Sequence, residues 1–298
     1  MTPTCQWHTS AGPAPSGRSP GPWTPRALRG LPVTPDLSYS DLIRRDRAVL
    51  VSAIAVLAAL AWAYTVRLAT GMGSMSINTM AASVAMPSTQ SWSLNDVVFM
   101  FVMWAVMMVA MMLPSATPMV LLFAGVMRKR KFDGRPFVPT ALFILGYLLV
   151  WVGFSAMATL ANWGLHVAGL LSSMMGRTTP MIGGFVLLFA GAFQWTPIKD
   201  ACLSHCRSPL VFLTAHWHDG RGGTLMMGLH HGLYCLGCCW LLMGLLFVLG
   251  IMNLPWIAGL TIFVLLEKVL PRGRFVSRLS GVVFAGWGMA LLATGVGH

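Results

Sequence analysis

A chain of 298 residues with 56% apolar and only 9% charged residues is too apolar for a soluble domain, in which about 25% of residues are charged. The mean hydropathy of +0.71 favours a polytopic membrane protein that has the lipid bilayer as its surroundings. The formal net charge of +12 is explained by basic loops that stay in the cytoplasm, so nucleic acid is not an expected partner.

The first 35 residues are rich in Pro, Gly and Ser, and they show no periodic pattern. Such a segment buries too little apolar surface to offset the entropy lost on ordering. We therefore expect a disordered N-terminal segment over residues 1–46 and a transmembrane helical domain over residues 47–298.

Apolar runs recur along the rest of the chain, and a spanning helix needs about 20 mostly apolar residues. The sequence predicts an all-α transmembrane bundle of about seven spans, of which the fourth and sixth are short: Ala48–Leu68, Val97–Val126, Phe137–Leu160, Met181–Thr196, Thr224–Gly250, Asn253–Glu267 and Leu279–Val296. A polar loop is expected over 69–95, with Met72, Met75, Met80 and Met86. Because a proline removes a helical hydrogen bond, the second span should kink or break at Pro114.

The basic residues predict how the chain is oriented. With seven spans and a cytoplasmic N-terminus, all of the 20 Lys and Arg residues except Arg67 and Arg177 fall on the inside. This is the distribution that the positive-inside rule describes. We therefore place the N-terminus in the cytoplasm.

The most informative stretch is 226–243, MMGLHHGLYCLGCCWLLM. Residues four apart lie on one face of a helix, so this stretch presents a ridge of sulfur and imidazole groups: Met227, His231, Cys235, Cys239 and Met243. Thiolates and thioethers select copper(I), whereas imidazole suits both copper and zinc. The sequence predicts an intramembrane metal site formed by His230, His231, Cys235, Cys238 and Cys239, with copper as the favoured metal and zinc as the alternative.

Two other segments carry candidate ligands. Met107 and Met111 lie on one ridge of the second span, where thioethers can bind copper(I) without losing a proton. Cys202 and Cys206 are four apart in the segment that precedes the fifth span, and His216 and His218 follow them. For each group the alternative is an ordinary role, as a packing face or as reduced thiols. At the end of the sixth span, Glu267 is expected either to pair with Lys268 or to support a ligand histidine.

Enzyme signatures are missing from the sequence. We find no nucleophile elbow, phosphate-binding glycine loop or H-E-x-x-H motif, and the chain has only eight acidic residues for acid–base chemistry. No catalytic residue is therefore predicted, and we do not expect an enzyme.

Four motifs, MWAVMMVAMMLPSATPM, QWTPIKDACLSHCRSP, CLGCCWLLMG and the later EK, carry a family resemblance over roughly residues 50–295. The chain resembles the bacterial family of predicted metal-binding integral membrane proteins, also described as polyphenol-oxidase-accessory-like. The resemblance implies a helical inner-membrane protein that handles a metal, with a polyphenol oxidase as a client cuproenzyme.

Three functions remain open from the sequence. The first is a membrane chaperone or transporter that handles copper(I) and supplies a cuproenzyme. The second is a structural or assembly subunit of a membrane complex. The third is a thiol–disulfide oxidoreductase that uses the C-x-x-C motif of Cys235 and Cys238.

Overall fold

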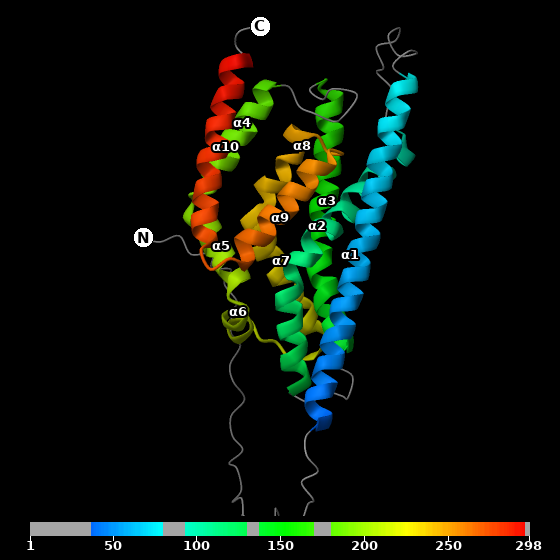
Figure 1. Ribbon diagram of the computed structural model, residues 1–298, viewed down its shortest axis with the longest axis vertical. Coiled ribbons are helices and arrows are strands. Elements are labelled where there is room, and N and C mark those ends of the chain that lie inside the picture. The colour runs from blue at the N-terminus through cyan, green and yellow to red at the C-terminus, as the bar shows by residue number, and fades with distance from the viewer. Residues whose placement is uncertain (1–36, 80–92, 130–136, 170–179, 296–298) are drawn as a thin grey trace, which may run out of the picture.

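The computed structural model describes residues 37–79, 93–129, 137–169 and 180–295, and all regular secondary structure in these ranges is helical. This confirms the predicted all-α class. The helices, shown in Figure 1, are α1 (Leu37–Thr79), α2 (Leu94–Lys129), α3 (Phe137–Val167), α4 (Pro180–Phe193), α5 (Pro197–Arg207), α6 (Pro209–Ala215), α7 (Gly220–Gly244), α8 (Leu246–Leu249), α9 (Leu254–Val269) and α10 (Gly273–Gly295).

Five of these helices are long and apolar enough to cross a membrane, namely Arg44–Gly71, Leu94–Arg128, Phe137–Val167, Gly220–Leu249 and Gly273–Ala293. A bent pair, Met181–Phe193 and Pro197–Arg207, makes a sixth candidate if its two helices, which meet at 65°, form one span. The predicted total of seven is not confirmed, because α9 has 16 residues and a full crossing needs about 20. The side of the membrane on which the chain begins stays a prediction.

Helix α1 is longer than the sequence pattern indicated. It begins at Leu37, before the predicted start of the helical domain at residue 47, and it continues to Thr79 through part of the expected polar loop. The segment 69–79 contains no proline, so the i to i−4 hydrogen bonds can continue through it. Residues 1–36, with most of the predicted disordered segment, and Met80 and Met86 lie outside the described residues.

Helix α2 runs without interruption through Pro114 and Pro118. Of the two predicted outcomes, a kink or a break, the break does not occur. Figure 1 shows the consequence as a bend, since the two halves of α2 run at different tilts. Neighbouring helices α1 and α3 pack along α2 and support the turns that the prolines weaken. The middle of α2 is consequently among the most buried parts of the described chain.

Glycines allow two pairs of helices to approach closely. A Cβ atom on Gly146 of α3 would lie 2.3 Å from the carbonyl oxygen of Leu225, and one on Gly228 of α7 would lie 2.1 Å from that of Phe143. Between α4 and α10, Gly191 and Gly281 form a similar contact. Because lipid is as apolar as a leucine side chain, close packing of this kind is what holds membrane helices together. It fixes α7 against α3.

Candidate metal centre

The sulfur and imidazole ridge of α7 points into the protein. Its members are at most 3% exposed, namely Met227, His231, Cys235, Cys239 and Met243. Cys238, which lies beside the ridge, is 1% exposed. The neighbouring Met226, by contrast, is 45% exposed. The helical spacing in the sequence therefore identified the buried face of α7.

Four thiols gather where α5 meets α7. Cys206, from the last turn of α5, has its sulfur within hydrogen-bonding reach of the thiols of Cys235 and Cys238. Cys239 is within reach of the same two thiols. In addition, the Sγ atoms of Cys238 and Cys239 lie 3.1 and 2.9 Å from the carbonyl oxygen of Cys235. We call Cys206, Cys235, Cys238 and Cys239 the thiol cluster.

Cys235 is the member of the thiol cluster with the most polar partners. Its Sγ lies 3.2 Å from the hydroxyl of Tyr147, which also lies 3.0 Å from the carbonyl oxygen of Met112. The ammonium of Lys268 donates to the same sulfur at 3.0 Å and to the hydroxyl of Ser115 at 2.9 Å. An ammonium group can only donate, and its positive charge stabilises the thiolate form that binds metals.

The remaining predicted thiol, Cys202, lies one helical turn before Cys206 and is 5% exposed. Its Sγ would be 2.9 Å from a Cβ atom placed on Gly237. The absence of a side chain at Gly237 thus lets α5 approach α7 closely. Cys202 belongs to the same buried core as the thiols of α7.

The predicted methionines also reach this core. Met107 is 1% exposed and Met111 is fully buried, and both belong to the core that contains Cys235, Cys238 and Cys239. Met112 belongs to it as well. The thioethers of Met107 and Met111 thus lie in the same core as the thiols of α7. Their role as metal ligands stays a prediction.

The structure separates the two adjacent histidines, because consecutive residues of a helix point in directions about 100° apart. The ring of His231 is buried among aromatic rings, with its centre 5.9 Å from that of Phe143 and 5.7 Å from that of Tyr147. The ring of His230 instead lies 5.7 Å from that of His216. His230 thus takes part in a second group of residues.

That second group is made of imidazoles. His205 of α5 lies with its ring centre 6.3 Å from that of His216, which follows α6, and its ring stacks on Tyr234 at 4.3 Å. Together with His218 and His230 these residues form what we call the histidine cluster. Burial lowers the pKa of His216; the hydrogen bond to the Phe212 carbonyl opposes this shift, and the nearby His205 and His218 add to it.

Glu267 has a different partner from the one expected. It forms a buried ion pair with Lys199 of α5, with Nζ 2.6 Å from Oε1 and both side chains at most 1% exposed. Lys199 also donates to Gln194, which accepts a hydrogen bond of 2.8 Å from Ser277. The expected pair of Glu267 with Lys268 is therefore wrong. It is Lys199 that neutralises the carboxylate, while Lys268, the next residue along α9, points to Cys235.

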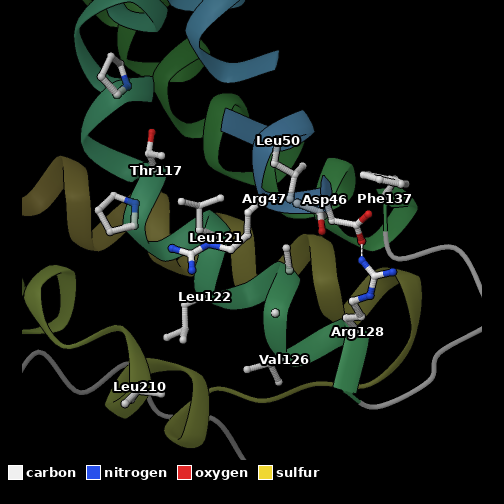
Figure 2. Close-up of a pocket in the computed structure, with 15 residues that line it drawn as sticks. Asp46, Arg47, Leu50, Thr117, Leu121, Leu122, Val126, Arg128, Phe137 and Leu210 are labelled. Atoms are coloured by element: carbon white, nitrogen blue, oxygen red, sulfur yellow. Dashed lines mark ion pairs between the residues drawn. The ribbon is translucent and has the colours of Figure 1, made fainter. Parts of the chain in front are cut away.

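A cavity of about 740 Å³ lies away from both clusters, between α1 and the second half of α2. Figure 2 shows its lining, with Leu50, Leu121 and Leu122 among the apolar side chains and the ion pair of Asp46 with Arg128 at one side. The lining contains no Cys, His or Met residue. This cavity therefore lacks the donors that copper(I) requires.

The donors of the thiol cluster fit a soft ion, since they are sulfurs, three of them buried, with the ammonium of Lys268 beside one of them. In the described part of the chain, however, no group of three or more Cys, His, Asp or Glu side chains converges closely enough to hold a metal ion. To hold an ion together, the sulfurs of Cys238 and Cys239 would have to turn from the Cys235 carbonyl towards the sulfur of Cys235.

Tyr147 and Ser115 were not singled out from the sequence, and Lys268 was considered only as a partner of Glu267. A lysine at the end of a membrane helix usually anchors that end at the membrane surface. The sequence around Lys268 therefore does not indicate a contact with Cys235. Tyr147 and Ser115 are brought to Cys235 by tertiary packing alone. The one available hint was that a lysine or tyrosine buried in a membrane domain needs a polar partner.

Together these features define a class of helical membrane protein with thiols and thioethers gathered in its core. Comparison with known families is consistent with that class: residues 101–291 match the family model PpoB2, described as a copper chaperone. The chain belongs to this copper-chaperone family. The matched range includes every candidate metal ligand discussed above. No curated protein and no solved structure gives a significant match to the chain.

Proposed function

We propose that this protein is a membrane copper chaperone that holds copper(I) at the thiol cluster and passes it to a client cuproenzyme of the polyphenol oxidase type. The observation that carries the proposal is the meeting of four thiols from two helices in one buried place, next to buried methionines. Family membership indicates that the metal is copper, since the matching family is one of copper chaperones. Zinc gains no support from either source.

In this proposal copper(I) is cargo, and each side chain has a role. Cys235 and Cys238 are the first ligands, with Cys239 and Cys206 available to replace them as the ion moves. Thioethers of Met107 and Met111 complete the coordination, and His231 and Cys202 lie in the surrounding wall. Binding releases the thiol protons, because a thiolate and not a thiol is the ligand.

Charge balance favours copper(I) in this place. Two thiolates and one copper(I) ion carry a net charge of −1, which is costly inside an apolar bundle. The ammonium of Lys268, 3.0 Å from the sulfur of Cys235, supplies the compensating positive charge. A divalent ion would need no such compensation when bound by two thiolates, so the lysine suits a monovalent cargo.

Release to a client requires a route out of the core, and α5 supplies the shortest one. Cys206 belongs to the thiol cluster and is only partly buried, unlike the three thiols of α7. A cysteine at the edge of a buried cluster can exchange its metal with a thiolate, thioether or imidazole of another protein. We therefore assign Cys206 as the ligand through which copper(I) is exchanged between the thiol cluster and its surroundings.

A delivery assay tests this function. The copper-loaded protein, reconstituted in vesicles, is mixed with an apo polyphenol oxidase, and the oxidase activity that appears is compared with that of a Cys235→Ser/Cys239→Ser variant. We expect activation by the wild-type protein and at least a tenfold loss with the variant. Cys5→Ser is the control for loss of a cysteine as such, because Cys5 is not among the proposed ligands. Equal activation by all three proteins would reject the proposal.

The same vesicles distinguish a chaperone from a transporter. A chaperone binds about one ion per chain, and copper inside the vesicles does not rise further with time. Continuous accumulation that depends on Cys235 would show transport instead. Thiol alkylation before and after addition of a quinone tests the oxidoreductase alternative, which requires Cys235 and Cys238 to change between thiol and disulfide.

A further inference from the structure

Four histidines lie together at the part of the molecule where α5, α6 and the first half of α7 meet. His216 is central, with ring centres 6.3 Å away at His205 and 5.7 Å away at His230. His218 lies within electrostatic range of both His216 and His230. His218 is exposed and the other three are partly buried, so a ligand from outside can reach them.

The hydrogen bonds of three of these rings fix which nitrogen carries the proton in the neutral imidazole. In each ring, Nδ1 faces a backbone carbonyl oxygen: His205 to Ala201 at 2.9 Å, His216 to Phe212 at 3.3 Å and His218 to His216 at 3.0 Å. A carbonyl oxygen only accepts, so Nδ1 must carry the proton and Nε2 must carry the lone pair. Metal-binding histidines are oriented by the same kind of contact.

The fourth ring has an unsatisfied nitrogen. Nδ1 of His230 is buried and has no hydrogen-bond partner within the described residues. An unpaired buried polar atom costs about 1–3 kcal/mol, and such atoms are uncommon in folded proteins. A bound ligand near His230 and His216 would remove that cost.

The spacing of the rings matches a shared ion. A metal–nitrogen bond is about 2.0 Å long, and a ring nitrogen lies about 1.1 Å from the ring centre, so two imidazoles in line on one ion have centres about 6 Å apart. The pair His205 and His216 and the pair His216 and His230, at 6.3 and 5.7 Å, both fit this value. Three rings do not converge on one point in the described chain, so binding is by pairs.

We propose that the histidine cluster is a second, nitrogen-based copper(I) site, at which cargo docks before it passes to the thiol cluster. His216 binds the ion together with His205 or His230, and His218 forms the outer rim. Copper stays in the +1 state throughout. Imidazole nitrogens are exchanged for sulfurs, and the protons of the thiols that bind the ion leave to water. The role as an entry site rests on the proposed function.

The two clusters are connected through α5 and α7, which carry His205 and His230 of the histidine cluster as well as all four thiols of the thiol cluster. His205 precedes Cys206 on α5, and Tyr234, on which the His205 ring stacks at 4.3 Å, precedes Cys235 on α7. The hydroxyl of Tyr234 also lies 3.4 Å from Nε2 of His216. An ion held by His205 and His216 therefore has Cys206 as the nearest thiol along the chain.

Two measurements with copper(I), supplied as its acetonitrile complex, test the site. The first uses a variant that lacks all four thiols of the cluster, with Ser in place of Cys206, Cys235, Cys238 and Cys239. We expect it to bind about one copper through nitrogen ligands, as seen by X-ray absorption, and to lose that copper when His205→Gln and His216→Gln are added. His166→Gln, on α3, is the matched control and should leave the nitrogen-bound copper unchanged.

The second measurement follows copper loading of the protein with intact thiols. The pair His205→Gln and His216→Gln should slow loading about tenfold while the final amount of sulfur-bound copper stays the same. His218→Gln, at the exposed rim, should slow loading less and serves as a variant that cannot disturb the core. Nitrogen-bound copper that survives without His205 and His216, or loading rates equal to wild type in all variants, would overturn the histidine site. If the wild-type protein takes up copper but shows no sulfur-bound copper after loading, the thiol site is rejected instead.

Discussion

The ammonium of Lys268 lies 3.0 Å from the sulfur of Cys235, and the two residues come from different helices, α9 and α7. A second hydrogen bond, of 2.9 Å to Ser115 on α2, holds the lysine in this position. Three helices thus meet at one charged contact inside an apolar core. The contact stabilises the thiolate of Cys235. Its positive charge would also balance the net charge of −1 that two thiolates and one copper(I) ion carry together.

Removal of this charge should weaken copper binding. We expect Lys268→Met to raise the dissociation constant for copper(I) about tenfold or more, which is the range for residues that support a metal ligand without touching the ion. Lys268→Arg keeps the charge and should bind more tightly than Lys268→Met. Competition with a colorimetric copper(I) chelator measures both constants. Unchanged affinity in Lys268→Met would show that the lysine has no part in binding.

The buried ion pair of Lys199 with Glu267 should matter for stability. Glu267→Gln leaves the ammonium of Lys199 buried without its carboxylate, which costs about 3 kcal/mol or more in comparable cases. The matched control is Asp200→Asn, because Asp200 pairs with Arg278 at 3.8 Å and that arginine is 65% exposed. Such a surface pair contributes less than about 1 kcal/mol. Unfolding of both variants in detergent, compared with wild type, measures the difference, and equal losses would contradict the prediction.

The close contact of α3 with α7 gives a third prediction. In Gly146→Ala the new methyl group meets backbone atoms of Leu225 and Leu229, at 2.3 and 2.9 Å, which no side-chain rotation can relieve. We expect a loss of about 1–3 kcal/mol, as for other overpacked positions. Gly153→Ala, on the same helix, has nothing within 4 Å of its new methyl group. That variant should be neutral or slightly stabilised, because Ala favours helix by about 1 kcal/mol over Gly.

A melting temperature in detergent for each glycine variant checks this pair. A lower value for Gly146→Ala with an unchanged or higher value for Gly153→Ala is expected. Copper binding adds a second readout, since separation of α3 from α7 would move Tyr147 away from Cys235. Two variants with the same melting temperature would show that the helices can separate at no cost.

Parts of this structure were predictable because they depend on local spacing. The helical class follows from long apolar runs, and the buried face of α7 follows from residues four apart, such as Cys235 and Cys239. The predicted end of the first helix was wrong. Apolar content marks the part of a helix that lies in an apolar environment and not the residue at which the helix ends. At Pro114 the sequence predicted a kink or a break without deciding between them, because the support from α1 and α3 cannot be read from α2 alone.

Other parts depend on contacts between distant residues, which one sequence does not reveal. The separation of His230 from His231 was within reach, because adjacent residues on a helix diverge, but the partner His216 comes from another segment. The partners of Glu267 and Lys268 were likewise not predictable from one sequence, because Glu267 pairs with Lys199 and Lys268 contacts Cys235. Either lysine was a possible partner for the carboxylate, and the bend between α4 and α5 decides in favour of Lys199.

The most direct test is the copper content and ligation of the purified full-length protein, wild type beside Cys235→Ser/Cys238→Ser/Cys239→Ser. The account predicts about one copper per wild-type chain with sulfur neighbours at the copper X-ray absorption edge, and loss of the sulfur signal in the variant. The same copper content with the same sulfur ligation in both proteins would contradict it.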